Sequence, residues 1–434
     1  MNEWIETTIG EYCPFIYGKS LSESKRQKGN IPVYGSNGIV GFHDKSLVEY
    51  PGIIIGRKGS VGAIHLSEEP FWAIDTSFYI YSTNLDELYF IYFLLKTLGL
   101  DKMNSDSAVP GLNRENAHSL KIRIPKQLIE REKIGKKLAI FDHKIHLNTK
   151  TNQTLEAIAQ ALYKSWFIDF EPVKAKQQTL AVGGSAAEAE RAAMRAISGK
   201  DDAALDALQL NDSAAYQQLQ QTAALFPAAL QDSELGEIPE GWEVSTIGES
   251  LETVGGATPS TKDETFWQNG NINWATPKDL SALQDFVLTD TERKITNSGL
   301  NKISSGLLPI NTVLLSSRAP VGYLALTQIP VAINQGFIAI KPNKMFSSYY
   351  ILQWCKANLG KIKNRAIGTT FAEISKSNFR GIKILVPSGA VTNLFSEKAE
   401  VIYKKITNNI LENKKLQNIR DELLPKLLSG ELTL

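Results

Sequence analysis

Gly-rich turns in both halves of this 434-residue chain carry side chains that suit nucleic-acid recognition. Arg can donate two hydrogen bonds to guanine, Asn and Gln pair with adenine, and Lys, Ser and Thr hold phosphate oxygens. The candidates are Lys19, Lys25, Arg26, Lys28, Tyr34, Ser36, Asn37, Arg57, Lys58 and Ser60 in the first half, and Thr258, Ser260, Thr261, Lys262, Ser316, Ser317, Arg318, Asn334 and Gln335 in the second. Solvated loops often have the same composition. The prediction that these residues contact nucleic acid therefore depends on the recurrence of such turns at matched places in the two halves.

No catalytic or metal-binding motif accompanies these turns. Gly18-Lys19-Ser20 ends like a phosphate-binding loop, but that loop needs another glycine five positions before Gly18, where Cys13 stands. His143 and His146 share a predicted helix face without the carboxylates that would complete a metal set. The sequence also lacks G-x-S-x-G, H-E-x-x-H and kinase signatures. We therefore predict neither a metal site nor a catalytic site in this chain.

Two stretches, 127–169 and 388–430, have apolar residues at alternating steps of four and three and predict two long helices that pack on each other. The seam residues are Ile134, Leu138, Phe141, Ile145, Asn148, Asn152, Leu155, Ala159, Leu162 and Trp166 in the first stretch, and Phe395, Ala399, Ile402, Ile406, Asn409, Asn413 and Leu416 in the second. The second set follows the first at a constant offset of 261, for example from Phe141 to Ile402. A helix of about 40 residues rises about 60 Å, so it can act as a spacer.

The two Asn pairs at the seam favour one register of the helices. An Asn at the seam lowers stability but rejects shifted pairings, because a displaced helix would bury an unpaired amide against Leu or Ile. The alternative is that the four Asn side chains face water on two separate surface helices.

The repeat extends beyond the helices. Trp4–Gly10 matches Trp242–Gly248 at offset 238, Ile53–Gly62 matches Val313–Gly322 at offset 260, and Ala73–Phe78 matches Ala332–Phe337. The second copy has thus gained 22 residues near its start. Each globular copy is expected to mix short strands with helices, one of which begins after Asn84 and ends before Gly99.

The predicted organisation is an α+β chain with two mixed α/β domains, two long antiparallel helices that form an intramolecular coiled coil, and pseudo-twofold repetition. The expected bounds are 1–125 for the first domain, 126–170 for the first long helix, 171–233 for a connector, 234–387 for the second domain and 388–434 for the second long helix. The connector is either partly helical, at Ala187–Ile197 and Ala203–Leu210, or a flexible linker.

Composition places the chain among globular proteins of a reducing compartment. Hydrophobic residues make up 43% of the chain, and the two cysteines have no C-x-x-C spacing. The net charge is +1, but residues 171–240 hold five basic and eleven acidic residues, a net of −6, which leaves +7 elsewhere. The start lacks a basic and apolar leader, and the most apolar run, Leu88–Leu100, is too short to span a bilayer and contains Lys96. We therefore expect a cytoplasmic protein without a membrane segment.

Three segments and the duplicated layout resemble the specificity subunit of type I restriction-modification systems. The segments are Leu162–Val173, Ser233–Val244 and Leu423–Leu432. This resemblance implies two target-recognition domains held apart by two antiparallel helices in a pseudo-twofold, nearly circular arrangement. Each domain would read one half of a split site in double-stranded DNA through the major groove, and the helices would fix the gap between the halves.

The resemblance also implies that the chemistry belongs to partners. Two modification subunits would bring S-adenosylmethionine and methylate adenine, motor-nuclease subunits would restrict unmodified DNA, and this chain would hold no cofactor and be no enzyme. The candidate DNA contacts come from turn chemistry and repeat position, because recognition domains vary within the family. Two other hypotheses stay open: an adaptor whose helices assemble proteins while its two repeated domains bind non-DNA ligands, and a self-contained nuclease or methyltransferase.

Overall fold

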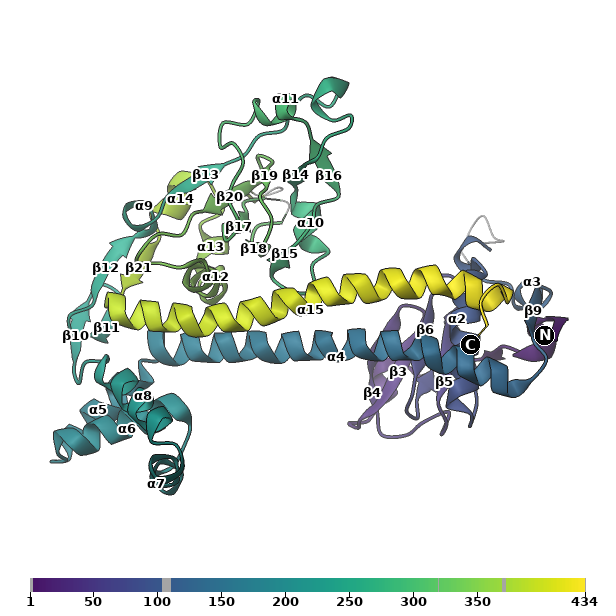
Figure 1. The fold of residues 1–434 in the computed structure, drawn as a ribbon, viewed down its shortest axis with the longest axis horizontal. Helices are drawn as coiled ribbons and strands as arrows, with labels where there is room; N and C mark the ends of the chain where they lie inside the picture. Colours follow the sequence, from purple (N-terminus) through teal and green to yellow (C-terminus); the bar gives the residue numbers. More distant parts are fainter. Residues whose placement is uncertain (1–2, 104–110, 319, 369–371, 434) are drawn as a thin grey trace. The chain divides into compact units, whose positions relative to one another are not determined.

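The computed structural model describes residues 3–103, 111–318, 320–368 and 372–433 of the chain (Figure 1). These residues form two compact units. Unit 1 comprises residues 1–148 and 412–434, and unit 2 comprises residues 149–411. The division falls within the two long helices rather than at their ends, where the predicted domain bounds lie.

Unit 1 contains three antiparallel or mixed sheets and short helices. The strands are β1 (Trp4–Thr8), β2 (Ile16–Tyr17), β3 (Ile31–Gly35), β4 (Gly38–His43), β5 (Gly52–Gly56), β6 (Ile64–Ser67), β7 (Trp72–Ala73), β8 (Ser77–Tyr81) and β9 (Lys121–Pro125). The helices are α1 (Ile9–Tyr12), α2 (Leu85–Thr97) and α3 (Arg114–His118), with single 3₁₀ turns η1 (Glu23–Lys25) and η2 (Leu100–Lys102). The described sheets have the strand orders β2-β8-β5-β6, β4-β3-β7 and β1-β9.

Local sequence explains the best-defined helix of unit 1. The Asn84 side chain caps α2 by accepting a hydrogen bond from the Glu87 backbone N–H, and Gly99 follows the helix in the left-handed region, as predicted. The apolar face of α2 packs on the fully buried strand β5 in one core with the start of the first long helix. Leu427 from the second long helix is also fully buried in this core.

Unit 2 repeats this plan with additions. Its strands are β10 (Leu230–Ser233), β11 (Gly236–Pro239), β12 (Glu243–Thr246), β13 (Thr253–Gly255), β14 (Ile272–Ala275), β15 (Val287–Leu288), β16 (Arg293–Ile295), β17 (Val313–Ser316), β18 (Leu324–Thr327), β19 (Ala332–Ile333), β20 (Phe337–Ile340) and β21 (Lys383–Val386). Its short helices after the connector are α9 (Ile247–Ser250), η3 (Glu264–Phe266), α10 (Pro277–Ser281), α11 (Asn297–Leu300), α12 (Ser348–Ala357), α13 (Leu359–Asn364) and α14 (Lys376–Arg380). The sheet orders β13-β20-β17-β18-β15, β16-β14-β19 and β12-β21 match those of unit 1 apart from β15.

Hydrogen bonds define how the two units correspond. The Arg57 N–H donates to Thr76 O in unit 1, and the Ser317 N–H donates to Gly336 O in unit 2, so both positions are related by an offset of 260. The predicted match of Ala73 with Ala332 is therefore wrong by one residue, because two similar short segments can be aligned without knowledge of the strand register. Most of the added residues of unit 2 lie between β14 and β17 and form α10, β15 and α11.

The two long helices are α4 (Leu128–Phe167) and α15 (Gly389–Ser429), and each contributes one part to each unit. Within each unit the two parts lie side by side and run in opposite directions (Figure 1). In unit 1 Asn148 bonds to Asn413 and Asp142 pairs with Arg420, whereas in unit 2 Asn152 bonds to Asn409 and Tyr163 packs on Phe395.

The residues of the predicted seam all lie on α4 and α15. None of them is exposed, and Asn148, Asn152 and Asn409 keep at most 3% of their surface. The alternative in which the four Asn side chains face water is therefore wrong for these three, and Asn413 is half-buried.

The connector forms helices over most of its length. They are α5 (Glu171–Ala181), α6 (Ala186–Ser198), α7 (Asp202–Asn211) and α8 (Ser213–Ala224). Their small core is built around Met194, Leu205 and Ala223. Phe226, which follows α8, packs edge-on against Trp166 at the end of α4, with ring centroids 5.2 Å apart. The connector is thus more regular than the predicted partly helical segment.

Candidate functional site

Several predicted site residues of both units hold the turns together rather than face outward. The buried Ser36 hydroxyl donates to Thr76 O at 2.8 Å and to Lys58 O. The buried Ser316 hydroxyl donates to Pro320 O at 2.7 Å and accepts hydrogen bonds from two backbone N–H groups. Tyr34 and Ser317 are buried as well. The prediction that these four side chains contact DNA meets a physical obstacle, because all four are buried and internal hydrogen bonds occupy the hydroxyls of Ser36 and Ser316.

The other predicted site residues reach the surface. Lys19, Lys25, Lys28, Asn37, Lys58, Thr258, Ser260, Thr261, Lys262 and Gln335 are exposed, and Arg26, Arg57, Ser60, Arg318 and Asn334 are half-buried. The structure brings Thr258 and Gln335 together through a side-chain hydrogen bond, although they are far apart in sequence. These residues remain predicted contacts.

The arginines among them have different partners. Arg26 donates to Val40 O at 2.7 Å, next to the turn between β3 and β4. Arg318 lies 3.8 Å from the carboxylate of Glu373. Arg57 donates to Asp75 O at 3.2 Å, and its guanidinium lies over the Tyr17 ring, 5.0 Å from the centroid.

In two places arginine side chains lie over an aromatic ring, and the sequence did not predict either contact. In unit 1 Arg114 also lies over the Tyr17 ring, 4.8 Å from its centroid. In unit 2 Arg293 lies over the Trp267 ring at 3.8 Å, and the Trp267 indole N–H donates to Ser260 O at 2.9 Å. Tyr17 directly precedes Gly18-Lys19-Ser20. No local signal in the sequence links Tyr17 to Arg114.

A buried polar network joins α4, α12 and α15 in unit 2. The Glu156 carboxylate accepts hydrogen bonds from Gln353 at 2.9 Å, from the Tyr403 hydroxyl at 2.8 Å and from Lys356. Burial lowers the pKa of Lys356, and the carboxylate of Glu156 opposes that shift. These contacts fix the helices of unit 2 rather than form a reactive centre.

A second set of hydrogen bonds connects the residues before β15 in unit 2 to the seam of the long helices. Asn152 donates to the Asp285 carboxylate at 3.1 Å and accepts a hydrogen bond from Asn409 at 2.8 Å. Burial raises the pKa of Asp285, whereas the hydrogen bond from Asn152 lowers it. One seam amide therefore also orients the chain before β15.

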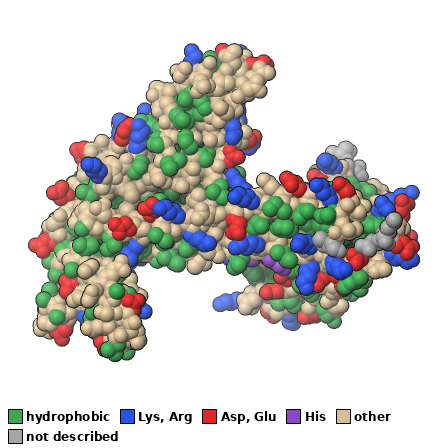
Figure 2. All heavy atoms as spheres, in the orientation of Figure 1, with side chains coloured by type: hydrophobic (Ala, Val, Ile, Leu, Met, Phe, Trp, Pro, Cys, Tyr) green, Lys and Arg blue, Asp and Glu red, His purple; other side chains and the backbone are tan. Residues whose placement is uncertain are grey.

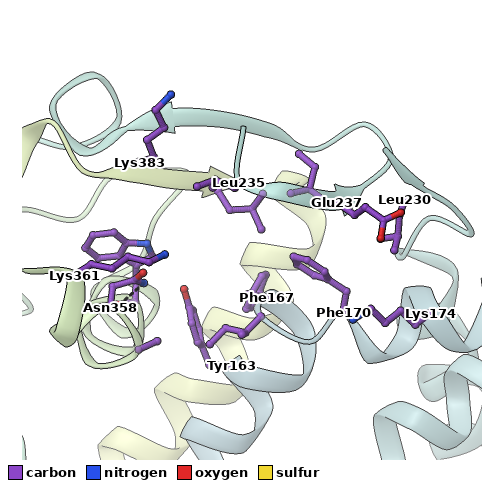
Figure 3. A pocket seen from close by; sticks show the side chains of 15 residues that line it. Tyr163, Phe167, Phe170, Lys174, Leu230, Leu235, Glu237, Asn358, Lys361 and Lys383 are labelled. Carbon is purple, nitrogen blue, oxygen red and sulfur yellow. Dashed lines mark hydrogen bonds between the residues drawn. The ribbon is translucent and has the colours of Figure 1, made fainter. Parts of the chain in front are cut away.

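A pocket of about 460 Å³ lies in unit 2 at the end of α4 (Figure 3). Tyr163 and Phe167 from α4 lie across it from Leu235 in the turn of the β10–β11 hairpin (Figure 3). The pocket is also lined by Lys174, Lys361 and Lys383, and Lys383 pairs with Glu234 of the hairpin. None of the predicted site residues lines it.

Charge and metal chemistry give no second site among the described residues. Figure 2 shows basic and acidic side chains interspersed on the drawn face. Over the part of the chain that the structure describes, no group of three His, Cys, Asp or Glu side chains is arranged to hold a metal ion, and no helix is long and apolar enough to cross a membrane. Cys13 and Cys355 are buried free thiols, and burial raises the pKa of each.

A comparison with protein families identifies the chain. The model of the type I restriction modification DNA specificity domain matches residues 1–157 and 239–420, which is most of the chain. The chain belongs to this family. The residues between the two matched ranges include α5 to α8, so these helices are an addition to the matched pattern.

Relatives within the family agree with this assignment. The specificity subunit of the type I restriction enzyme HindI from Haemophilus influenzae is 33% identical over 377 residues, which cover 83% of this chain and 81% of that protein. The MjaIX specificity subunit from Methanocaldococcus jannaschii is 34% identical over 201 residues, 45% of this chain and 44% of that protein. The S subunit of a type I restriction-modification system from M. genitalium shares the fold, with a TM-score of 0.58 at 16% identity over 98% of this chain and 96% of that one.

Proposed function

We propose that this chain is the non-catalytic DNA-specificity subunit of a type I restriction-modification complex and that it recognises a bipartite site, one half per unit. The observation that carries the proposal is the repetition of one sheet plan in two units of a chain that belongs to the specificity family. Two copies of one reading domain suit a target with two specified halves. The differences in their turn residues suit halves of different sequence.

The exposed turn residues supply the chemistry of DNA contact in this proposal. Lys19, Lys58 and Lys262 are exposed and would hold phosphates, and the half-buried Arg57 and Arg318 would read base edges. Phosphate contacts release counterions, so the affinity for DNA should fall steeply as salt rises. An adaptor with an apolar ligand groove should respond little to salt, which separates the two hypotheses.

Partner subunits would perform the reactions. We propose that two modification subunits, which bind S-adenosylmethionine, dock on the long helices and that restriction subunits join the complex. Large apolar side chains on these helices support docking: Ile140 and Leu147, seven residues apart on α4, are 56% and 58% exposed, and Val401 on α15 is 71% exposed. Exposed apolar residues at helical spacing are typical of a surface that a further helix covers.

The experiment that tests this function maps N6-methyladenine in DNA from cells that express the chain together with its modification subunit. The expected result is a split motif with a fixed gap that disappears when this chain is deleted. Methylation that does not depend on this chain, despite an active modification subunit, would contradict the proposal.

The role of the helices as the ruler of the gap needs its own test. Four residues inserted after Asn148 lengthen α4 by about one turn. Because the Asn148–Asn413 and Asn152–Asn409 contacts then cannot both form in register, we expect a changed gap or lost binding. An unchanged motif would show that the helices do not set the gap.

A further inference from the structure

We propose that Arg57, whose guanidinium lies over the Tyr17 ring, reads a guanine in the half-site bound by unit 1, and that Ser317 at the equivalent position makes the half-site of unit 2 differ there. This inference rests on the proposed function, because it names the residue by which one unit selects a base. It extends the turn prediction to a defined cluster of Tyr17, Arg57 and Arg114.

The cluster is assembled by the sheet and not by sequence proximity. Strand β2 ends at Tyr17, which pairs in register with Phe78 of β8, and Arg57 follows the end of β5, the other neighbour of β8. The Leu112 N–H donates to Arg57 O at 2.8 Å, which brings the start of α3 to the same place. The two guanidinium groups of Arg57 and Arg114 thus lie over one exposed ring, at 5.0 and 4.8 Å from its centroid.

This arrangement places two positive charges at one exposed aromatic ring. Each cation gains from the face of the Tyr17 ring. Arg114 is partly neutralised by Glu115, whose carboxylate lies 2.9 Å away, and Arg57 has no carboxylate partner among the described ion pairs. An anionic or electron-rich ligand would complement this positive charge, and Tyr17 is 47% exposed and therefore accessible.

The contacts of Arg57 limit the movement of its guanidinium and leave N–H donors available for a base. The guanidinium lies 5.0 Å from the centroid of the Tyr17 ring and 5.8 Å from that of the Phe78 ring, and Nη1 donates to Asp75 O. A guanidinium has five N–H donors, so donors remain for the O6 and N7 acceptors of guanine. A planar fork that is already oriented loses less entropy on binding than a free side chain.

Unit 2 has the same three positions with different residues. Gly255 pairs with Ile338 as Tyr17 pairs with Phe78, and the Ile374 N–H donates to Ser317 O as the Leu112 N–H donates to Arg57 O. The first residues of α14 and α3 then make Lys376 the counterpart of Arg114.

The Lys376 side chain lies next to Gly255 in unit 2. The Lys376 Nζ lies 3.5 Å from the point where a Cβ on Gly255 would stand, so an ammonium group occupies the space next to the position of Tyr17. The buried Ser317 cannot form a bidentate fork. At this place in the fold, unit 1 therefore has Arg57, which we propose reads a base, whereas unit 2 has Lys376, a residue of the type that binds phosphate.

The test is a binding selection from randomised duplex DNA with the full chain in complex with its modification subunits. The wild-type complex should select a split motif with a guanine in one half. Arg57→Gln should reduce the preference for that guanine by about 5- to 150-fold and shift it towards adenine, which Gln reads, while the other half-site stays unchanged.

Variants of Tyr17 test its positioning role. Tyr17→Phe keeps the ring and should keep the guanine preference, whereas Tyr17→Ala should weaken the preference at the same base pair. Arg123→Ala is the matched control, because Arg123 also lies over an aromatic ring, that of Trp4 at 5.6 Å, in unit 1. It should leave both half-sites unchanged, and circular dichroism should show all variants folded.

The outcomes separate this inference from the function on which it rests. A wild-type complex that selects no split motif contradicts the proposed function itself. A split motif that Arg57→Gln leaves unchanged, or binds with uniformly lower affinity and the same base preferences, overturns the base-reading role alone, as does a motif without guanine in either half.

Discussion

The Asn409 side-chain amide donates a 2.8 Å hydrogen bond to the Asn152 side-chain oxygen, and both residues are almost completely buried. The repeat offset of 261 converts this pair into Asn413 and Asn148, which are bonded at 2.8 Å in unit 1. The two pairs differ in their surroundings: Asn148 also donates to Glu412 at 2.8 Å, whereas Asn152 also donates to Asp285. Each unit thus contains one amide pair, with at least one buried partner, that favours a single register of α4 and α15.

Replacement of one of these Asn residues should test whether the amide pairs fix the register of α4 and α15. Asn409→Ala leaves the buried Asn152 oxygen without its donor, and we expect a loss of about 1–3 kcal/mol in the free energy of unfolding. Asn413→Ala is the matched control, because Asn148 keeps Glu412 as an acceptor, and the loss should be below about 1 kcal/mol. Denaturant unfolding of the purified chain measures both, and equal losses would contradict the assignment.

The Glu156 network predicts a larger effect in unit 2. Glu156→Gln leaves the ammonium of Lys356, whose side chain is 8% exposed, without its counter-charge. Loss of one partner of a buried ion pair costs about 3–5 kcal/mol.

An exposed pair on α15 is the control for that variant. Glu400 and Lys404 are 2.7 Å apart and well exposed, so Glu400→Gln should cost less than about 1 kcal/mol. Thermal unfolding in the same buffer compares the two variants, and a loss for Glu156→Gln no greater than that for Glu400→Gln would show that the network does not stabilise unit 2.

Gly135 on α4 predicts a steric effect in unit 1. A Cβ at this position would lie 2.1 Å from Asp86 O and 2.7 Å from the Phe90 nitrogen, both on α2. Gly135→Ala should therefore separate α4 from α2 and destabilise unit 1 by about 1–3 kcal/mol.

The control for this variant is a helical glycine with free space. Nothing lies within 4 Å of a Cβ at Gly360 on α13, so Gly360→Ala should be neutral or stabilise by up to about 1 kcal/mol, because alanine favours the helix. Calorimetry that finds the two variants equally stable would contradict a close crossing of α2 and α4.

Asp285 predicts a dependence of stability on pH. Burial raises its pKa above the ordinary value of 3.8, so the folded state holds the proton more tightly than the unfolded state does. The free energy of unfolding should then fall as pH rises from 3.8 through the raised folded-state pKa. Asp285→Asn can still accept the hydrogen bond from Asn152, and it should remove this fall.

Unfolding measured from pH 3 to 7 checks that sign. The variant should become more stable relative to the wild-type chain as pH rises and should match it in acid. A difference between the two proteins that does not change with pH would contradict the shift.

The regular features of the fold were predictable because each has a local signal. The seam of α4 and α15 follows from helical spacing of apolar residues, and the start and end of α2 follow from Asn84 and Gly99. The correspondence of the two units was predictable from the Val61-Gly62 and Val321-Gly322 turns, whose offset of 260 the hydrogen bonds reproduce.

The candidate site was less predictable because side-chain burial depends on tertiary contacts. Ser36 and Ser316 have the types expected of ligand-binding turns, but their hydroxyls bond to distant carbonyls or to their own turn. The contact of Tyr17 with Arg57 and Arg114 depends on the pairing of β2 with β8, which brings together residues from separate parts of the sequence. Propensity and spacing do not encode such contacts.

The position of Leu427 has a consequence for how the chain is made. Unit 1 is discontinuous: its core needs Leu427, yet the whole of unit 2 is encoded between residues 148 and 412. During synthesis all residues of unit 2 are therefore made before the part of α15 that completes the hydrophobic core of unit 1. We therefore expect the core of unit 1 to be completed only after α15 emerges from the ribosome, and its apolar face to be exposed to chaperones until then.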